Sequence, residues 1–234
     1  IVGAFIAIVI TKQLFGGLGM NFANPALVAR IVLFTGFASR MTAWVYPAKA
    51  TRTLTMMGVD AATGATPLQV EGGVGKYPLM DLFMGVHGGV MGETCALAIL
   101  IGLAWLLITR TITATIPLTY VGSYALFSFL LNVGELGAAD AGMLVLHEVL
   151  AGGLLFGAVF MATDYVTSPF TFVGKIVFGI GLGLVTFGIR AFGSMPEGVS
   201  YAILFMNLLV PYINDLAHQV PLGYKKHKKG AKAA

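Results

Sequence analysis

Apolar stretches long enough to cross a membrane recur along the whole sequence. They lie near residues 26–46, 94–109, 112–131, 143–163, 171–190 and 200–217, and residues 1–10 resemble the end of another. A membrane-spanning helix needs about 20 mostly apolar residues. Only 10% of the 234 residues are charged, whereas a soluble domain has about 25%. The sequence therefore predicts an all-α polytopic membrane protein, a multi-helix bundle whose N-terminal part we expect to be missing from this chain.

Glycine-rich segments lie within these apolar stretches and between them. GGLLFGA (152–158) and GIGLGL (179–184) fall inside predicted spans, where small residues allow helices to pack closely. GGLGMNFANP (16–25) and GVHGGVMGET (85–94) each end just before a predicted helix. Glycine in such loops allows the backbone to approach a ligand, and the following helix offers N–H donors. Re-entrant turns packed within protein also need glycine, so the residues alone leave both interpretations open.

The distribution of charge predicts the orientation of the helices. The C-terminal segment YKKHKKGAKAA is strongly basic and is expected in the cytoplasm, because cytoplasmic segments are enriched in Lys and Arg. Counting spans back from it places the loops at 132–142 and 47–93 outside. We therefore expect a transmembrane helical domain at 1–224 with an external loop at 47–93, and a basic cytoplasmic tail at 225–234. No folded basic face accompanies the tail, so no nucleic-acid partner is expected.

Polar side chains inside the apolar stretches mark candidate functional positions, because burying them in a membrane is costly. This class contains Arg40, His147, Glu148, Asn207 and Asp215. Each also fits a structural interpretation in which a neighbouring helix satisfies the polar group. The single cysteine, Cys95, cannot by itself hold an iron–sulfur cluster or a cysteine-rich zinc site, although one thiolate could join a cluster shared between subunits. We expect Cys95 to be a small helix-packing residue and expect no metal site in this chain.

The segment DAATGATP (60–67) is small and polar within a weakly apolar region. Asp60 to Thr66 fits the pattern D-x-x-[ST]-G-A-T, which resembles the acceptor site of bacterial flavin transferases. Those enzymes attach FMN through its phosphate to the hydroxyl of the last threonine, which is Thr66 here. Gly64 and Ala65 leave room for the approach of a second protein, and Thr63 completes the pattern. A motif this short also fits a plain turn when it is considered in isolation.

A wider resemblance runs along nearly the whole chain. It rests on GGLGMNFANPAL (16–27), DAATGATPL (60–68), GVMGETCALAILIG (89–102), MATDYVTSP (161–169) and PEGVSYAILFMNLLVP (196–211). The chain is similar to the family that contains the D subunit of Rnf complexes, which are ion-translocating ferredoxin:NAD oxidoreductases. The same family contains the B subunit of the sodium-translocating NADH:quinone oxidoreductase. Pro67 and Leu68 look more like the Rnf D subunit, whereas Tyr165 departs from the family pattern, which usually has proline there.

The resemblance implies a membrane electron-transfer subunit of a redox-driven Na⁺ or H⁺ pump in the bacterial cytoplasmic (inner) membrane, with no catalytic residue of its own. It implies that Thr66 carries covalent FMN as a phosphoester on the outer face. The surroundings of that FMN would be Asp60, Thr63, Gly64, Ala65, Glu93 and Thr94. A second flavin, riboflavin, would lie by Asn21 and Asn24 on the inner side. The implied partners are the other subunits of the complex, a flavin transferase and membrane lipids.

The candidate ion contacts are Glu148, Asp164 and Asp215. The family fold also implies repeated helical halves, which would be inverted repeats here. Two alternatives stay open. One is the quinone-reductase B subunit, with the same arrangement of flavins. The other is a flavin-free small-solute channel or transporter, since glycine-interrupted helices with polar groups inside the membrane fit that class. A third interpretation is a passive anchor for catalytic partners, which predicts that the Thr66 hydroxyl is dispensable.

Overall fold

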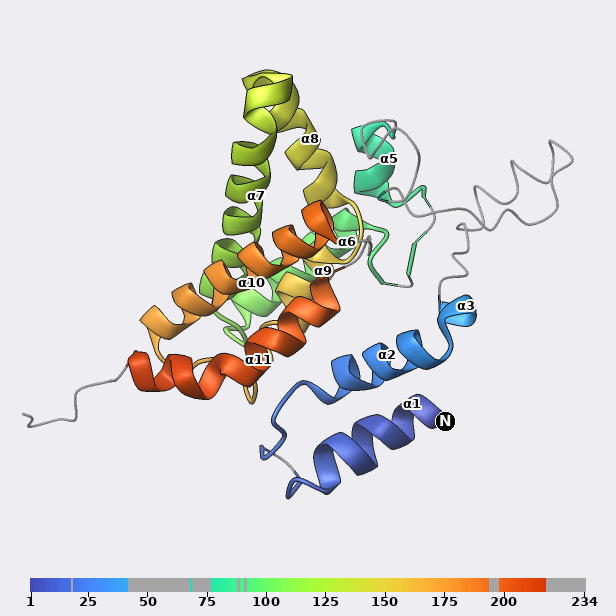
Figure 1. Ribbon diagram of the computed structural model, residues 1–234, viewed down its shortest axis with the longest axis vertical. Coiled ribbons are helices and arrows are strands. Elements are labelled where there is room, and N and C mark those ends of the chain that lie inside the picture. The colour runs from blue at the N-terminus through green and yellow to red at the C-terminus, as the bar shows by residue number, and fades with distance from the viewer. Residues whose placement is uncertain are drawn as a thin grey trace, which may run out of the picture.

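The computed structural model describes residues 1–17, 19–41, 68, 77–87, 89–90, 92–193 and 198–217. Within these ranges the elements that the chain forms are helices (Figure 1). The predicted acceptor residues Asp60, Thr63, Gly64, Ala65 and Thr66 lie outside the described residues, as does the basic tail. Of the predicted external loop, Leu68 and residues 77–87, 89–90 and 92–93 are described.

Three of the predicted spans, at 112–131, 171–190 and 200–217, match single long helices. In chain order the elements are α1 (Val2–Phe5), η1 (Ile6–Gln13), α2 (Pro25–Gly36), α3 (Ala38–Met41), α5 (Leu79–Met84), α6 (Ala96–Ile108), α7 (Thr115–Leu136), α8 (Ala138–Leu150), α9 (Leu154–Phe156), η3 (Gly157–Met161), α10 (Phe172–Phe192) and α11 (Val199–Leu216). Helices α7, α10 and α11 are long and apolar enough to cross a membrane. Helix α8 and the segment 154–161 form a fourth crossing if the two parts, which meet at 64°, are one bent span. These findings confirm an all-α polytopic membrane protein.

Two predicted spans are shorter than expected in the described residues. Helix α6 has 13 residues where a span was predicted at 94–109, and α2 has 12 residues where one was predicted at 26–46. At a rise of about 1.5 Å per residue, α6 covers roughly 20 Å, which is less than the ~30 Å apolar core of a bilayer. Helix α6 stops where Thr109 bonds back to the carbonyl of Trp105 and Arg110 takes a positive φ of 56°.

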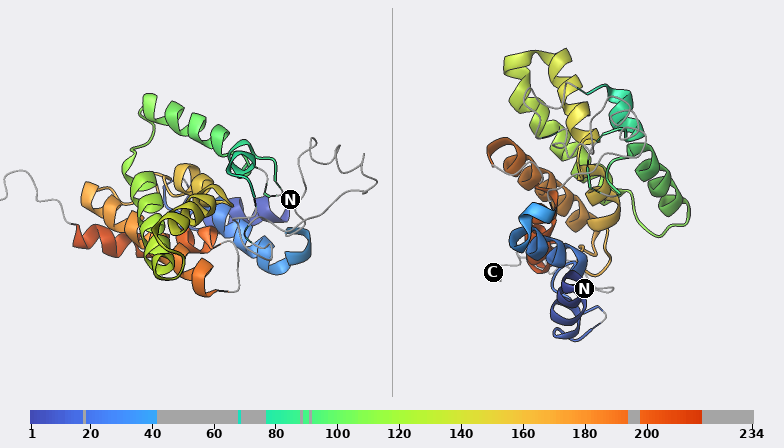
Figure 2. Two further views of the ribbon diagram at one scale, coloured as in Figure 1. Left: turned by 90° about the horizontal axis from the view of Figure 1, so that it is seen from above. Right: turned by 90° about the vertical axis from the view of Figure 1, so that its right-hand side faces the viewer.

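The tip of α7 and α8 and the N-terminal helices α1, η1 and α2 lie at opposite ends of the molecule (Figure 2, right). Between them α7 and α10 cross and pack closely, with Thr119 beside Gly179 and Ser123 beside Gly183. The glycines predicted to allow close packing make this possible. A methyl group at Gly179 would overlap the Thr119 hydroxyl, and one at Gly183 would overlap the Ser123 hydroxyl. The Ser123 hydroxyl also donates to the carbonyl of Gly179 at 3.2 Å. Small residues four apart on each helix therefore bring the two backbones together, as in other membrane helix pairs.

The bend between α8 and α9 comes from residues 151–153. Ala151 is extended, with φ −88° and ψ 140°, and Gly152 has a positive φ of 68°. The ideal Cβ position at Gly153 lies 2.9 Å from a carboxylate oxygen of Glu93. A side chain at position 153 would have to displace the end of the Glu93 side chain, so the chain around Glu93 packs directly against the break.

The loop predicted at 132–142 is mostly helical, so that prediction was wrong. Helix α7 continues to Leu136 and α8 begins at Ala138, with Gly137 at φ 81° as the single joint between them. The alanines after Gly137 are good helix formers, and one glycine with positive φ is enough to reverse the chain. As a result Glu148 lies near the α8–α9 break, whereas the sequence had placed it near the outer end of its span.

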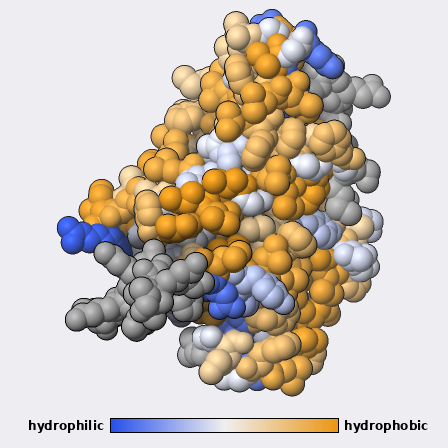
Figure 3. Space-filling model, turned by 60° about the vertical axis from the view of Figure 1, so that its left-hand side comes forward, coloured by the Kyte–Doolittle hydropathy of each residue, from blue (hydrophilic) through white to orange (hydrophobic). Residues whose placement is uncertain are grey.

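The core lies where α7, α9, α10 and α11 meet. Its fully buried large side chains include Tyr120, Phe178, Leu182 and Ile203. Apolar residues also cover much of the face that Figure 3 shows. Large apolar side chains are exposed along two of the long helices, namely Leu118, Leu126 and Leu130 of α7 and Val173, Val177, Ile180 and Leu184 of α10. An apolar exterior around an apolar core is the arrangement expected of a bundle that lies in lipid.

Candidate functional site

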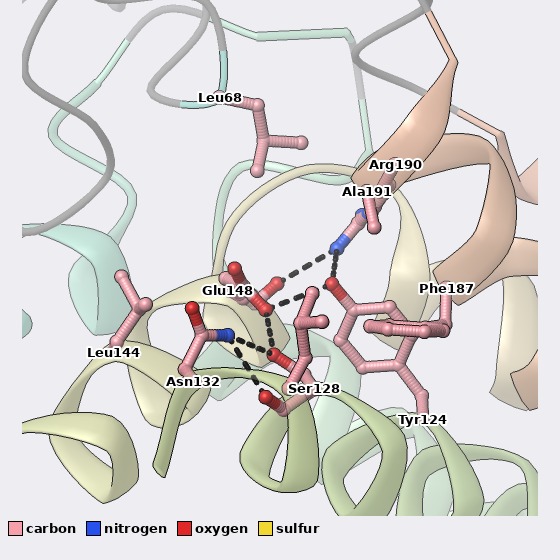
Figure 4. A pocket seen from close by; sticks show the side chains of 10 residues that line it. Leu68, Tyr124, Ser128, Asn132, Leu144, Glu148, Phe187, Arg190 and Ala191 are labelled. Carbon is pink, nitrogen blue, oxygen red and sulfur yellow. Dashed lines mark hydrogen bonds between the residues drawn. The ribbon is translucent and has the colours of Figure 1, made fainter. Parts of the chain in front are cut away.

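A cavity of about 350 Å³ lies between α7, α8 and α10 (Figure 4). Its volume is within the range of small-molecule and cofactor sites, roughly 300–1,000 Å³. Apolar side chains line half of it, namely Leu68, Leu131, Leu144, Phe187 and Ala191. The other half is polar and consists of Tyr124, Ser128, Asn132, Glu148 and Arg190. Apolar walls with a few converging polar groups are typical of a small-molecule or cofactor site.

The polar side chains form one hydrogen-bonded network. The Glu148 carboxylate oxygen Oε2 accepts from the Tyr124 hydroxyl at 3.0 Å and from the Ser128 hydroxyl at 2.6 Å. Arg190 Nη1 donates to the Tyr124 hydroxyl at 3.2 Å and to the backbone carbonyl of Glu148 at 3.0 Å. The Arg190 guanidinium also lies over the Tyr124 ring, 5.1 Å from its centre. A cation and an anion are thus held together between three helices through a tyrosine, which offsets the cost of partly burying each charge.

The α8–α9 break helps to hold Arg190 in this position. Because Ala151 is extended and followed by Gly152, its carbonyl is not used within α8, and Arg190 Nη2 donates to it at 3.4 Å. The cavity therefore depends on the broken span as well as on the packing of α7 against α10.

Leu68 connects this cavity to the predicted acceptor segment. Its side chain lines the cavity and packs against Leu82 and Ala151, so the chain just after the acceptor motif is fixed beside the broken span. Tyr77 packs in the same small cluster, and its backbone carbonyl lies 3.1 Å from His147 Nε2. Leu68 and Tyr77 therefore both pack beside the C-terminal end of α8.

Glu93 and Thr94, predicted near the flavin, do not line this cavity. Glu93 is 3% exposed, and its Oε1 accepts from the backbone N–H of Val90 at 2.9 Å. His87, in the same loop, is 1% exposed. Because the Glu93 carboxylate faces Gly153 while Arg190 bonds to Ala151, the two charged residues lie at the same break in the span. Glu93 thus lies at the break beside the cavity, but it does not line the cavity wall.

A second cavity, of about 500 Å³, lies near the N-terminal ends of α7 and α10, away from the first cavity. Asn24 and Asp164, two predicted site residues from distant parts of the chain, both line it, together with Lys12, Thr163 and Tyr165. Asn24 Oδ1 caps α2 by accepting from the N–H of Ala26, and Asp164 accepts from Thr167. Asn21 is not in this wall; its side chain donates to the carbonyl of Ala23.

Asn207 of α11 lies beside the second cavity and joins Asn24 to Thr167. The residue is buried, and in the amide orientation that suits its neighbours its nitrogen donates to the Thr167 carbonyl while its oxygen accepts from the Asn24 N–H. Neighbouring segments therefore satisfy the polar amide of Asn207, as the structural interpretation of this residue predicts. Asp215, by contrast, is exposed in the last turn of α11 and lines neither cavity.

Known proteins match the chain over its whole length. A family model described as the NQR2, RnfD, RnfE family covers residues 1–223. The chain belongs to this family. The resemblance predicted from the five sequence segments is thereby confirmed.

Named relatives in the family include components of ion-translocating complexes. The chain is 41% identical to the D subunit of the Na(+)-translocating ferredoxin:NAD(+) oxidoreductase complex of Acetobacterium woodii, over 100% of this chain and 69% of the relative. It is 36% identical to the D subunit of the proton-translocating ferredoxin:NAD(+) oxidoreductase complex of Clostridium ljungdahlii, over 96% of this chain and 68% of the relative. It is 38% identical to the B subunit of the Na(+)-translocating NADH-quinone reductase of Chromohalobacter salexigens, over 98% of this chain and 56% of the relative.

Sequence reasoning missed most of the first cavity. Arg190 is an ionisable residue at the end of an apolar stretch, and the rule that singled out Glu148 applies to it equally. Tyr124, Ser128 and Asn132 recur every four residues in α7, which places them on one helix face. This polar stripe in an otherwise apolar helix was the available signal.

Proposed function

We propose that this chain is the membrane electron-transfer subunit of an Rnf-type, redox-driven ion pump and that it carries FMN covalently on Thr66. Its relatives are named as subunits of such complexes, which supports a role as one subunit among several and not as a catalyst alone. One relative is named for Na⁺ and another for protons, so the proposal covers either ion.

The observation that carries the proposal is the position of Leu68 in the wall of the first cavity. Thr66 precedes Leu68 by two residues, and two residues of chain extend at most ~7 Å. An FMN esterified to Thr66 therefore has this cavity within reach of its ribityl chain. The apolar side chains suit the faces of the isoalloxazine ring, and the hydrogen-bonding groups of Asn132, Glu148 and Arg190 suit its polar edge.

The second cavity is our candidate for a riboflavin site. Asn24 and Asp164 offer amide and carboxylate groups there, and the volume exceeds that of the first cavity. The two cavities lie near opposite ends of α7 and α10, which supports electron transfer through the bundle between two flavins. From the charge distribution we assign the Thr66 segment to the outer face of the bacterial inner membrane and the C-terminus to the cytoplasm.

In-gel flavin fluorescence tests covalent attachment. The full chain is made in cells that contain an active flavin transferase, and the wild type is compared with Thr66→Ala on a denaturing gel. Thr55→Ala is the matched control, since Thr55 lies in the same region outside the motif. We expect fluorescent bands for the wild type and Thr55→Ala and a dark band for Thr66→Ala. A dark wild-type band beside another fluorescent substrate of the transferase would refute the proposal and favour a flavin-free channel or transporter.

Turnover of the assembled complex separates the proposal from a passive anchor. Thr66→Ala should abolish ferredoxin- or quinone-linked electron transfer while the complex still assembles. Unchanged turnover in that variant would establish the anchor instead.

A further inference from the structure

We infer that Glu148 and Arg190 act as an opposed pair of charges that tunes the reduction potential of the flavin in the first cavity. The inference rests on the proposed function, because it requires a flavin in that cavity. It assigns to both side chains a positioning and electrostatic role, with no part in bond making or breaking.

The direction of the hydrogen bonds in the network follows from its two ends. Arginine can only donate, so the Tyr124 oxygen is the acceptor from Arg190 Nη1 and its proton is directed to Glu148. At the other end, the Ser128 carbonyl can only accept, so the Asn132 group that faces it at 2.8 Å is Nδ2. Asn132 Nδ2 also lies 3.5 Å from the Ser128 hydroxyl oxygen, which directs that hydroxyl proton to Glu148.

Both chains of donors therefore end on one carboxylate oxygen, Oε2 of Glu148 (Figure 4). Because Oε2 accepts both hydroxyl protons, it carries no proton of its own. The 2.6 Å separation between Ser128 and Glu148 agrees, since O–H···O⁻ bonds are about 2.5–2.7 Å long. The cavity thus presents a fixed negative charge on α8 and a fixed positive charge on α10.

Both charges face the space in which the ring would lie, because Glu148 and Arg190 each line the cavity. His147, the titratable neighbour of Glu148 on α8, turns away from it toward the carbonyls of Met143 and Tyr77. One-electron reduction adds negative charge to a flavin ring. A nearby cation makes that step easier and a nearby anion makes it harder, and the effect is large where water is excluded.

We expect that neutralising Glu148 and neutralising Arg190 shift the midpoint potential of the flavin in opposite directions. The full chain, purified from cells that contain the transferase, is titrated reductively with mediators while the flavin absorbance is followed. Glu148→Gln should raise the potential relative to the wild type, and Arg190→Gln should lower it. Glu135→Gln and Lys175→Gln are matched controls, because Glu135 lies near the end of α7, Lys175 lies near the start of α10, and neither lines the cavity. Both controls should leave the potential unchanged.

The in-gel fluorescence of each variant separates failure of this inference from failure of the proposed function. Fluorescent variants whose potentials do not move, or that move in the same direction, overturn the inference and leave covalent FMN standing. A non-fluorescent wild type overturns the proposed function itself. If Arg190→Gln does not accumulate, Glu148→Gln decides alone, since glutamine keeps the shape of the side chain and a carbonyl that still accepts from Ser128.

Discussion

Replacing Gly183 by alanine should weaken the bundle by forcing α7 and α10 apart. The ideal Cβ at Gly183 lies 2.7 Å from the backbone nitrogen of Tyr124 and overlaps the Ser123 hydroxyl. Real Cβ atoms essentially never approach another atom within 3.0 Å, so the two backbones must separate by at least a few tenths of an ångström. A side-chain rotation cannot relieve this contact, because its partner is backbone.

Gly188→Ala is the matched control for this change. Gly188 lies on the same helix and has no atom within 4 Å of its ideal Cβ. Alanine favours a helix over glycine by about 1 kcal/mol, and this gain is common to both variants. Their difference therefore isolates the packing cost, which is about 1–3 kcal/mol for an overpacked contact. At roughly 2–4 °C per kcal/mol for a chain of this size, Gly183→Ala should melt about 2–12 °C below Gly188→Ala.

The assay uses the single thiol of the chain. Cys95 is partly buried, so its reaction with a maleimide dye in detergent reports unfolding as the temperature rises. Equal melting temperatures for the two variants, or a higher one for Gly183→Ala, would refute the close parallel packing of α7 and α10.

Two further changes test the second cavity with the same thiol assay. Asn207→Leu should lower the melting temperature, because it leaves the Asn24 N–H and the Thr167 carbonyl without their buried partner, at about 1–3 kcal/mol for each unsatisfied group; a neutral effect would contradict this bridging role. Asn24→Ala should cost ~1 kcal/mol by removing the side-chain cap of α2, whereas Asn24→Asp should keep the cap, so equal losses in both variants would argue against capping.

The sequence predicted α7, α10 and α11 well, because apolar runs of sufficient length have few alternatives in a membrane. It also predicted the close packing at Gly179 and Gly183, where small residues recur at the right spacing. It failed at 132–142, where three glycines and two acids suggested a loop although only Gly137 interrupts the helices. Because α8 begins at Ala138, Glu148 lies further along its span than the sequence predicts.

The first cavity was harder to predict, because it depends on contacts between distant residues. Glu148 was identified from its charge alone, but its partners come from α7 and α10. The meeting of Arg190 with the Ala151 carbonyl depends on a break in α8 that the glycines at 152 and 153 suggest but do not locate. For Asn207 and Asp215 the same rule about polar groups in membranes gave candidates, and packing gives Asn207 a structural role and leaves Asp215 exposed.

Covalent flavin attachment is tested most directly by mass spectrometry of the peptide that contains Thr66. Trypsin should release residues 53–76 after Arg52 and Lys76, and this peptide also contains Thr53, Thr55 and Thr63. We predict a mass increase equal to FMN less one water, with fragment ions that place it on Thr66. An unmodified peptide from cells with an active transferase, or a modification on another threonine, would contradict the proposal.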